Sequence, residues 1–321
     1  MCRTYHDKNN KCYVQAMLPK GKKYQLVFFD FESETRRIYD DHDDDDENSG
    51  NIDEGSAINS KIHIVNTVCA TYFCDECLCG VDIDYIQADF SDKDCQRCCS
   101  STNSERRMKT FITGVGGCED ALEWFVRWLF TGIPGGCNRP ETTYVIGHYA
   151  GRFFICFMRR KIEDLSFCVC NFRYDLHLLL HQIYKMKGIA PEIIRSGNKI
   201  YQLKLRRKKG VCPELIFKDS FNFISQRLDT LPKTMGLNLQ PKLFFPHHWN
   251  REENMHTELD HLPDKKYYNP SSFNAKKREE FEKFYTENCN NKFLLSDALK
   301  EYCGMNWIFF LNHIHFHTNT L

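Results

Sequence analysis

The chain has 321 residues, 17 of them cysteine, and equal numbers of basic and acidic residues (43 each), so its formal net charge is zero. This balance excludes a globally basic field of the kind that marks many nucleic-acid-binding proteins, so any basic surface must be local. No apolar stretch reaches the roughly 18 to 20 residues that span a bilayer, and no secretory signal accompanies the cysteines. We therefore expect a reduced, intracellular protein without a membrane segment.

The first predicted element is a buried strand over residues 24–31 (YQLVFFDF), a β-rich apolar run that ends on two acids, Asp30 and Glu32. Residues two apart on a strand point to the same face, so the two carboxylates can share a divalent cation. An Asp-x-Glu pair is more often a surface feature, and the buried context is what favours a metal role here.

Two unusual segments follow this strand. Residues 40–60 carry many like charges and almost no apolar side chains, which predicts a disordered, solvated loop. After a second predicted strand (residues 63–73), residues 74–99 form a cysteine-rich insertion. Cys74-x-x-Cys77 and Cys95-x-x-Cys98, separated by 17 residues, have the spacing of a structural Cys₄ zinc site. The alternative is a reduced loop without metal.

The rest of the chain alternates strands with helices, which predicts an α/β domain. The expected elements are a strand at 108–113, a helix at 118–130, a strand at 143–147, a helix at 175–187, a hairpin at 192–205 that turns at Gly197-Asn198, a strand at 215–217, and helices at 275–285 and 296–302.

Two further polar motifs lie far from Asp30 in the sequence. An Asn-x-x-Tyr-Asp string runs from Asn171 to Asp175 and opens a predicted helix, while Tyr302 and Asn306 lie one helical turn apart. Together with Asp-x-Glu, these strings resemble the three exonuclease motifs of the DEDD superfamily. The resemblance implies a ribonuclease H-like mixed sheet flanked by helices.

Longer strings extend the resemblance over nearly the whole chain: KDSFNFI (218–224), LPKTMGL (231–237) and PHHWN (246–250). With them the chain resembles the exonuclease region of protein-primed family B DNA polymerases, the kind carried by Polinton (Maverick) elements and linear plasmids.

That family implies a 3′–5′ exonuclease in which Asp30, Glu32 and Asp175 hold two Mg²⁺ or Mn²⁺ ions and Tyr302 orients the attacking water. It also implies that Ser220, with Phe221 and Asn171, grips the single-stranded primer end. For Ser220 a helix-capping role is the alternative. The implied partners are single-stranded or primer–template DNA and a terminal protein primer, and the implied location is the nucleus.

The sequence departs from the family at three places. Asn306 stands where the family has Asp, and a neutral amide removes a charge that helps to hold the metal, so we expect impaired cleavage. Residues 153–173 interrupt a family motif as an anomalous insertion. Beyond the exonuclease domain, which we place at residues 24–306 after an N-terminal arm (1–23), the tail 307–321 diverges. No polymerase palm follows, so we expect no nucleotide addition by this chain alone.

Two rival hypotheses remain beside an active exonuclease. A catalytically inactive remnant could bind single-stranded DNA through the local basic cluster of Arg206, Arg207 and Lys208. Alternatively, the insertion at the active-site helix could prevent a stable fold.

Overall fold

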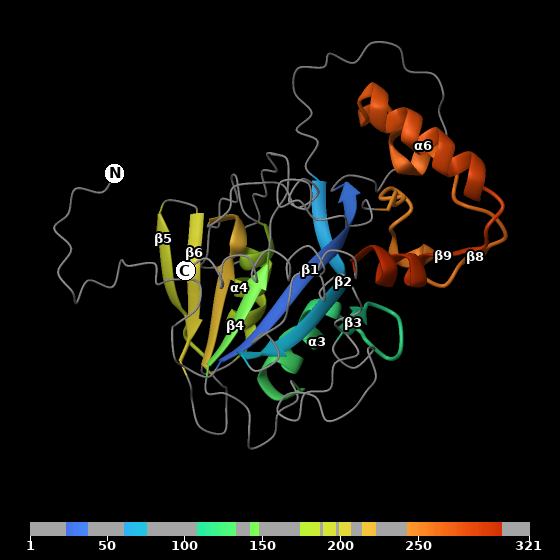
Figure 1. Cartoon of the computed structure of the whole chain (residues 1–321). Helices are drawn as coiled ribbons and strands as arrows, with labels where there is room; N and C mark the ends of the chain where they lie inside the picture. The colour runs from blue at the N-terminus through green and yellow to red at the C-terminus, as the bar shows by residue number, and fades with distance from the viewer. Residues whose placement is uncertain are drawn as a thin grey trace, which may run out of the picture.

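The computed structural model describes residues 24–37, 61–75, 108–132, 142–147, 174–186, 189–196, 199–206, 214–222 and 243–303. They form a mixed α/β structure, in which a seven-stranded sheet is flanked by helices and the C-terminal part folds around a second core (Figure 1). The predicted arm (1–23), acidic loop (40–60), insertion (153–173) and tail (307–321) lie outside the described residues, and so does most of the cysteine-rich segment.

The central sheet has the strand order β3-β2-β1-β4-β7-β6-β5. β1, β2 and β3 are successively antiparallel, whereas β4 runs parallel to β1 and β7 runs parallel to β4. β6 and β5 are added antiparallel at the far edge. The strands are β1 (Tyr24–Arg37), β2 (Lys61–Cys74), β3 (Met108–Ile112), β4 (Thr142–Gly147), β5 (Glu192–Ser196), β6 (Lys199–Leu205) and β7 (Glu214–Asp219).

The apolar run of β1 is buried on both faces, which explains why it shows no alternation in the sequence. Phe29 and Phe31 contact Phe125 of helix α3, with ring centroids 5.4 and 6.0 Å away. Phe28 contacts Phe73 of β2 at 6.2 Å. Because successive residues of a strand alternate between faces, Phe28 lies on the face opposite to α3, and so do Asp30 and Glu32.

Two helices bury their apolar stripes in the core of the sheet. α3 (Ala121–Arg127) begins after Asp120, whose carboxylate accepts a hydrogen bond from the Glu123 N–H, and it continues as the π-helical turn η3 (Trp128–Gly132). α4 (Tyr174–Lys185) buries residues 176, 179, 180 and 183, the i, i+3, i+4, i+7 spacing of an amphipathic helix. α3 contacts β2, β3 and α4.

Residues 243–303 form the C-terminal unit, which lies beside one end of β1 and β2 (Figure 1). Its largest helix, α6 (Ala275–Asn288), places the fully buried Phe281 against Phe244 and Tyr268, with ring centroids 5.3 and 5.2 Å away. Residues 295–303 are helical. The short elements are β8 (Glu258–Leu259), β9 (Phe293–Leu294) and the 3-10 turns η5 (Ser220–Asn222, after β7), η7 (Glu252–Asn254), η8 (Lys265–Tyr268) and η9 (Pro270–Ser272).

An irregularity in the β1–β2 ladder attaches the C-terminal unit to the sheet. The register shifts between Glu32 and Ser33, which leaves Asn66 of β2 outside the regular pairing. The Asn66 side-chain amide donates to Asn250 Oδ1 at 2.8 Å, and Asn250 Nδ2 donates to the Ser33 carbonyl at 3.2 Å. The PHHWN segment is therefore fixed to β1 at Ser33, one position after Glu32 and three after Asp30.

A buried carboxylate completes this attachment. Glu34 of β1 is 3% exposed and accepts hydrogen bonds from the Arg36 guanidinium and, at 3.0 Å, from the backbone N–H of Glu252. Arg36 also reaches the Glu252 carboxylate at 3.1 Å. Burial on its own would raise the pKa of Glu34, but these hydrogen bonds and the charges of Arg36 and Arg251 lower that pKa below its ordinary value.

All the predicted strands and helices exist, and their ends differ by a few residues. The one informative difference is at β1, which we predicted to end at the two acids. β1 instead continues to Arg37, because β2 pairs with it along its whole length while β4 stops opposite Phe29. Asp30 is thus the first residue of β1 beyond its parallel neighbour. No helix in the described part of the chain is long and apolar enough to cross a membrane.

Candidate exonuclease-type site

The parallel-paired segments of three strands end together beside Asp30. The pairing of Phe29 with Gly147, and of Gly147 with Asp219, aligns the carboxyl ends of the parallel segments of β1, β4 and β7. In α/β sheets, ligands bind outside the carboxyl ends of parallel strands. This edge is therefore the natural place for a site, and Asp30 lies on it.

Gly147 brings β4 unusually close to β1 at this edge. A Cβ atom at Gly147 would lie 2.8 Å from Phe29 Cζ and 3.2 Å from Phe29 Cε1, closer than side chains tolerate. The Phe29 ring thus occupies the space that any larger residue would need. The position of the residue before Asp30 depends on this glycine.

Asp30 and Glu32 point to the same face of the sheet, as the alternation predicts. Their cross-strand partners on β2 are Cys69 and Thr67. Directly paired residues of an antiparallel ladder share a face, so Cys69 lies beside Asp30. Cys69 Sγ also lies 3.6 Å from Thr110 Oγ1 of β3.

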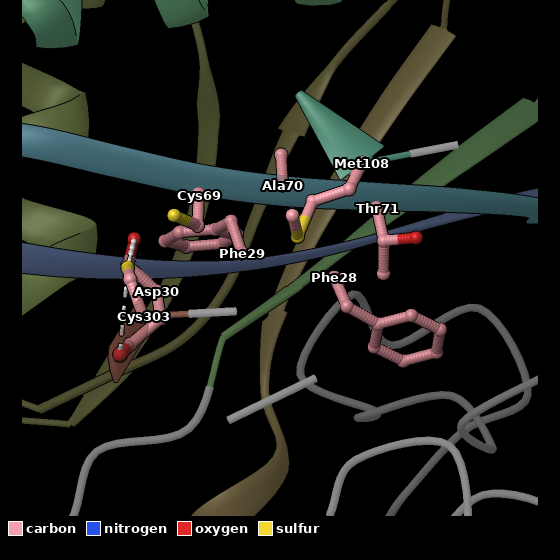
Figure 2. Close-up of a pocket in the computed structure, with 8 residues that line it drawn as sticks. All are labelled: Phe28, Phe29, Asp30, Cys69, Ala70, Thr71, Met108 and Cys303. Atoms are coloured by element: carbon pink, nitrogen blue, oxygen red, sulfur yellow. Dashed lines mark hydrogen bonds between the residues drawn. The ribbon is translucent and has the colours of Figure 1, made fainter. Parts of the chain in front are cut away.

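The C-terminal helical segment, residues 295–303, reaches the same face. Figure 2 shows Cys303 against Asp30: its Sγ lies 3.5 Å from the Asp30 carbonyl oxygen and 4.0 Å from Asp30 Oδ2. The neighbouring residue is Tyr302, of the predicted third motif. The structure thus brings together the first motif and the start of the third, which are more than 270 positions apart in the sequence.

Aromatic contacts hold Tyr302 in place. Its ring stacks on Phe245 at 4.7 Å between centroids and meets the His247 ring edge-to-face at 5.5 Å. The Tyr302 hydroxyl lies 3.4 Å from His247 Nε2. Both partners belong to the segment that Asn250 fastens to the sheet, so the position of Tyr302 is linked to the β1 irregularity.

The inner side of Asp30 is tightly closed. A cavity of ≈ 10 Å³ lies between Asp30, Cys69 and Cys303, which is room for one water molecule at most. Burial raises the pKa of the Cys303 thiol well above its usual range, and the adjacent Cys69 and the carboxylates of Asp30 and Glu32 raise it further. Cys303 is therefore a protonated thiol that donates toward Asp30.

The predicted DNA-gripping residues Ser220 and Phe221 lie at the end of β7 on the same sheet edge. Ser220 is buried, and its hydroxyl donates to the Gly147 carbonyl at 3.1 Å. Asp219 caps this turn by accepting from the Phe221 N–H at 2.9 Å. Before them, Lys218 is 1% exposed, and burial lowers its pKa to about 8.

The structure leaves several predicted residues undescribed. Asp175 is the second residue of α4, but its side chain is not among those described, so its distance to Asp30 is not defined. Asn171, Asn306, Arg207, Lys208, Cys77, Cys95 and Cys98 lie outside the described residues.

Two further predicted residues are described. Arg206, at the end of β6, forms an exposed ion pair with Glu192. Cys74 ends β2, where its side chain is fully buried in the sheet core. These positions leave both the DNA-binding and the zinc predictions open.

Within the described residues, no three His, Cys, Asp or Glu side chains are grouped so that they could hold a metal ion. Asp30 and Glu32 nevertheless supply two carboxylates on one face. Carboxylate oxygens are the ligands that Mg²⁺ and Mn²⁺ prefer, so this donor set fits such ions in kind.

Residues 156–306 match a family model described as DNA polymerase type B, organellar and viral. This part of the chain is therefore similar to type B DNA polymerases. It includes α4 with Asp175, the β7 edge with Ser220, and the C-terminal unit through Tyr302 to Asn306. Comparisons with curated proteins and with solved structures found no match.

Sequence reasoning missed the residues that surround the two acids. Cys69, Cys303 and His247 all lie beside a predicted site residue, yet the sequence analysis gave none of them a chemical role. Cys303 follows Tyr302 directly, and this adjacency was the one available signal. Cys69 could be found only from the β1–β2 register, which the sequence does not define.

Proposed function

We propose that this chain is the 3′–5′ exonuclease region of a protein-primed family B DNA polymerase, with its nuclease activity impaired by Asn306. The observation that carries the proposal is the contact of Cys303 with Asp30, which sets the helix that bears Tyr302 against the strand that bears Asp30 and Glu32. The family match over residues 156–306 supports it independently, because the match contains neither Asp30 nor Glu32.

The strand order also favours a ribonuclease H-like domain. The first three strands of the sheet form an antiparallel meander with β1 innermost, and β4 and β7 then run parallel to β1. A mixed sheet of this kind, flanked by helices, is what the resemblance to DEDD exonucleases implies. On this interpretation the β5–β6 hairpin is an addition at the open edge.

In the proposed chemistry, each of a few side chains has a separate role. Asp30 and Glu32 present hard oxygen ligands from one strand, and Asp175 at the start of α4 is the proposed third carboxylate. A pair of divalent cations held there would supply an activated water and stabilise the leaving 3′ oxygen. The Tyr302 hydroxyl, held by Phe245 and His247, would orient the attacking water. Ser220 would position the DNA end at the carboxyl end of β7.

Asn306 explains why we expect weak cleavage. It lies one helical turn after Tyr302 in sequence, where the motif has Asp. An amide oxygen can still bind a hard cation, but it brings no negative charge. A site with one carboxylate fewer holds divalent cations less tightly, so the loss of activity should be greatest at low cation concentration.

The test is reversion of this one residue. The full chain and its Asn306→Asp variant are incubated with Mn²⁺ and a 5′-labelled single-stranded oligonucleotide, and shortening of the 3′ end is followed on a gel. The variant should degrade the oligonucleotide at least about tenfold faster, because the restored carboxylate strengthens the hold on the cations. Adding Asp30→Asn to this variant should abolish the gain.

The matched control is Asp297→Asn, which neutralises an exposed acid on the same helical segment. This change should leave the rate unaltered in the reverted chain. Equal, measurable rates for the full chain and Asn306→Asp would refute the impairment by Asn306, and no shortening by either protein would refute the exonuclease proposal. Salt-sensitive binding of the oligonucleotide without cleavage by either protein would instead identify the chain as a DNA-binding remnant.

Several finer features belong to the same proposal. We propose a structural zinc ion on Cys74, Cys77, Cys95 and Cys98, DNA as the main partner, a protein primer as a second partner, a role in replicating a mobile element, and a nuclear location. Each follows from the resemblance or from cysteine spacing.

A further inference from the structure

The thiol of Cys303 occupies a position that the proposed chemistry does not use. Cys303 is 1% exposed and ends the described part of the helical segment 295–303. Its Sγ faces both the main chain and the side chain of Asp30, 3.5 Å from the carbonyl oxygen and 4.0 Å from Oδ2 (Figure 2). The Cys303 thiol thus contacts the backbone and the carboxylate of the same residue.

The surroundings leave this carboxylate little freedom on its inner side. Cys69 lies directly opposite Asp30 on β2, and Cys303 contacts both residues. The cavity between them is ≈ 10 Å³, too small for a substrate group.

Cys303 is also bonded in sequence to Tyr302. The contact of Cys303 with β1 therefore also determines the position of the Tyr302 backbone. Phe245 and His247 then hold the Tyr302 ring. A thiol is a weak hydrogen-bond donor, so this contact contributes little to stability. The contact matters for the orientation of Asp30, because residues that hydrogen-bond to a metal ligand determine how that ligand faces the metal.

We propose that Cys303 is a positioning residue, whose thiol orients the Asp30 carboxylate toward a divalent cation and sets the distance between Asp30 and Tyr302. This inference rests on the proposed function, since it assumes that Asp30 is a metal ligand. It assigns a role to a residue that neither the motif pattern nor the family match singles out.

The test separates the donor from the volume of the side chain. Cys303→Ser keeps a donor, Cys303→Val keeps the volume without a donor, and Cys303→Ala keeps neither. Binding of Mn²⁺ to each full-length variant is measured by electron paramagnetic resonance of the free ion, with no DNA present. Circular dichroism establishes beforehand that each variant is folded.

We expect the Mn²⁺ dissociation constant to rise about tenfold in the Val and Ala variants, the lower end for groups that orient a metal ligand, and less than about twofold in Ser. Cys289→Val is the matched control. This thiol is half-buried near the end of α6 and bonds only locally, to the Thr286 carbonyl at 3.7 Å, so its loss should leave the constant unchanged.

Asp30→Asn distinguishes the two possible failures. If it abolishes Mn²⁺ binding while Val and Ala bind like the unaltered chain, the positioning role is wrong and the metal site stands. If Ser weakens binding as much as Val, the thiol acts by shape alone and the inference is likewise wrong. If the unaltered chain binds no Mn²⁺, or Asp30→Asn binds it equally well, the metal role of Asp30 fails and the inference falls with it. Should Val fail to fold, the comparison of Ala with Ser decides.

Discussion

Removing the Glu34 carboxylate should loosen the C-terminal unit from the sheet. Glu34 accepts the Glu252 N–H and is paired with Arg36 in a nearly water-free position. In Glu34→Ala the partly buried N–H of Glu252 loses its partner, at a cost of about 1 to 3 kcal/mol. Arg36 is 46% exposed and stays hydrated, so the larger penalty for orphaning a fully buried charge does not apply.

We therefore expect Glu34→Ala to lower the free energy of unfolding by about 1 to 3 kcal/mol, and Glu34→Gln, which keeps an oxygen acceptor, by about 1 kcal/mol. Urea denaturation followed by far-UV circular dichroism measures both. The control is Glu253→Gln, an exposed neighbour whose ion pair with Arg251 is worth under about 0.5 kcal/mol.

The pH dependence gives a second check on the same residue. The pKa of Glu34 is lower in the folded chain than its ordinary value of 4.5. A carboxyl of this kind contributes stability above the unfolded pKa and loses that contribution as the pH falls through the folded pKa. The difference between the unaltered chain and Glu34→Gln should be complete at pH 7 and shrink below about pH 4.5. A loss no larger than that of Glu253→Gln at pH 7 would refute this account of the attachment.

Three further changes test other parts of the structure. Gly147→Ala should destabilise the chain by about 1 to 3 kcal/mol, because the new methyl group would press on the Phe29 ring, and a Phe29→Leu second change should recover part of this loss in urea denaturation. Tyr302→Phe removes the contact of the hydroxyl with His247 but keeps the ring stacking. In the Asn306→Asp chain it should slow cleavage while changing the free energy of unfolding by less than about 0.5 kcal/mol. Equal cleavage rates would exclude the hydroxyl from the chemistry. Elemental analysis should find one zinc ion per chain and none after Cys77→Ser, and a zinc-free unaltered chain would contradict the site.

The elements of the fold were predictable because they depend on local pattern. Leu176, Leu179 and Ile183 repeat with helical period, and the run before Asp30 can only be a buried strand. The face shared by Asp30 and Glu32 followed from the same periodicity. These signals lie within about ten residues of one another and need no knowledge of what lies elsewhere in the chain.

The surroundings of the site were not predictable, because they depend on register and on long-range contacts. Nothing local places Cys69 opposite Asp30, since shifting the β1–β2 pairing by one residue would exchange the faces. Glu34 reads in the sequence as one more surface acid. Only the structure shows its burial and its hydrogen bond with the N–H of Glu252, which lies 218 positions later in the sequence.

The continuation of β1 past its parallel neighbour separates the acids from the connection between the first two strands. The chain leaves the sheet at Arg37 and returns at Lys61, which are paired with each other. Arg37 is seven positions beyond Asp30, or about 23 Å along an extended strand, more than two Debye lengths in physiological salt. Evolution can therefore lengthen, shorten or recharge that connection without moving Asp30 relative to Cys69, and this stretch of the chain is a suitable place to insert a tag or a fluorophore.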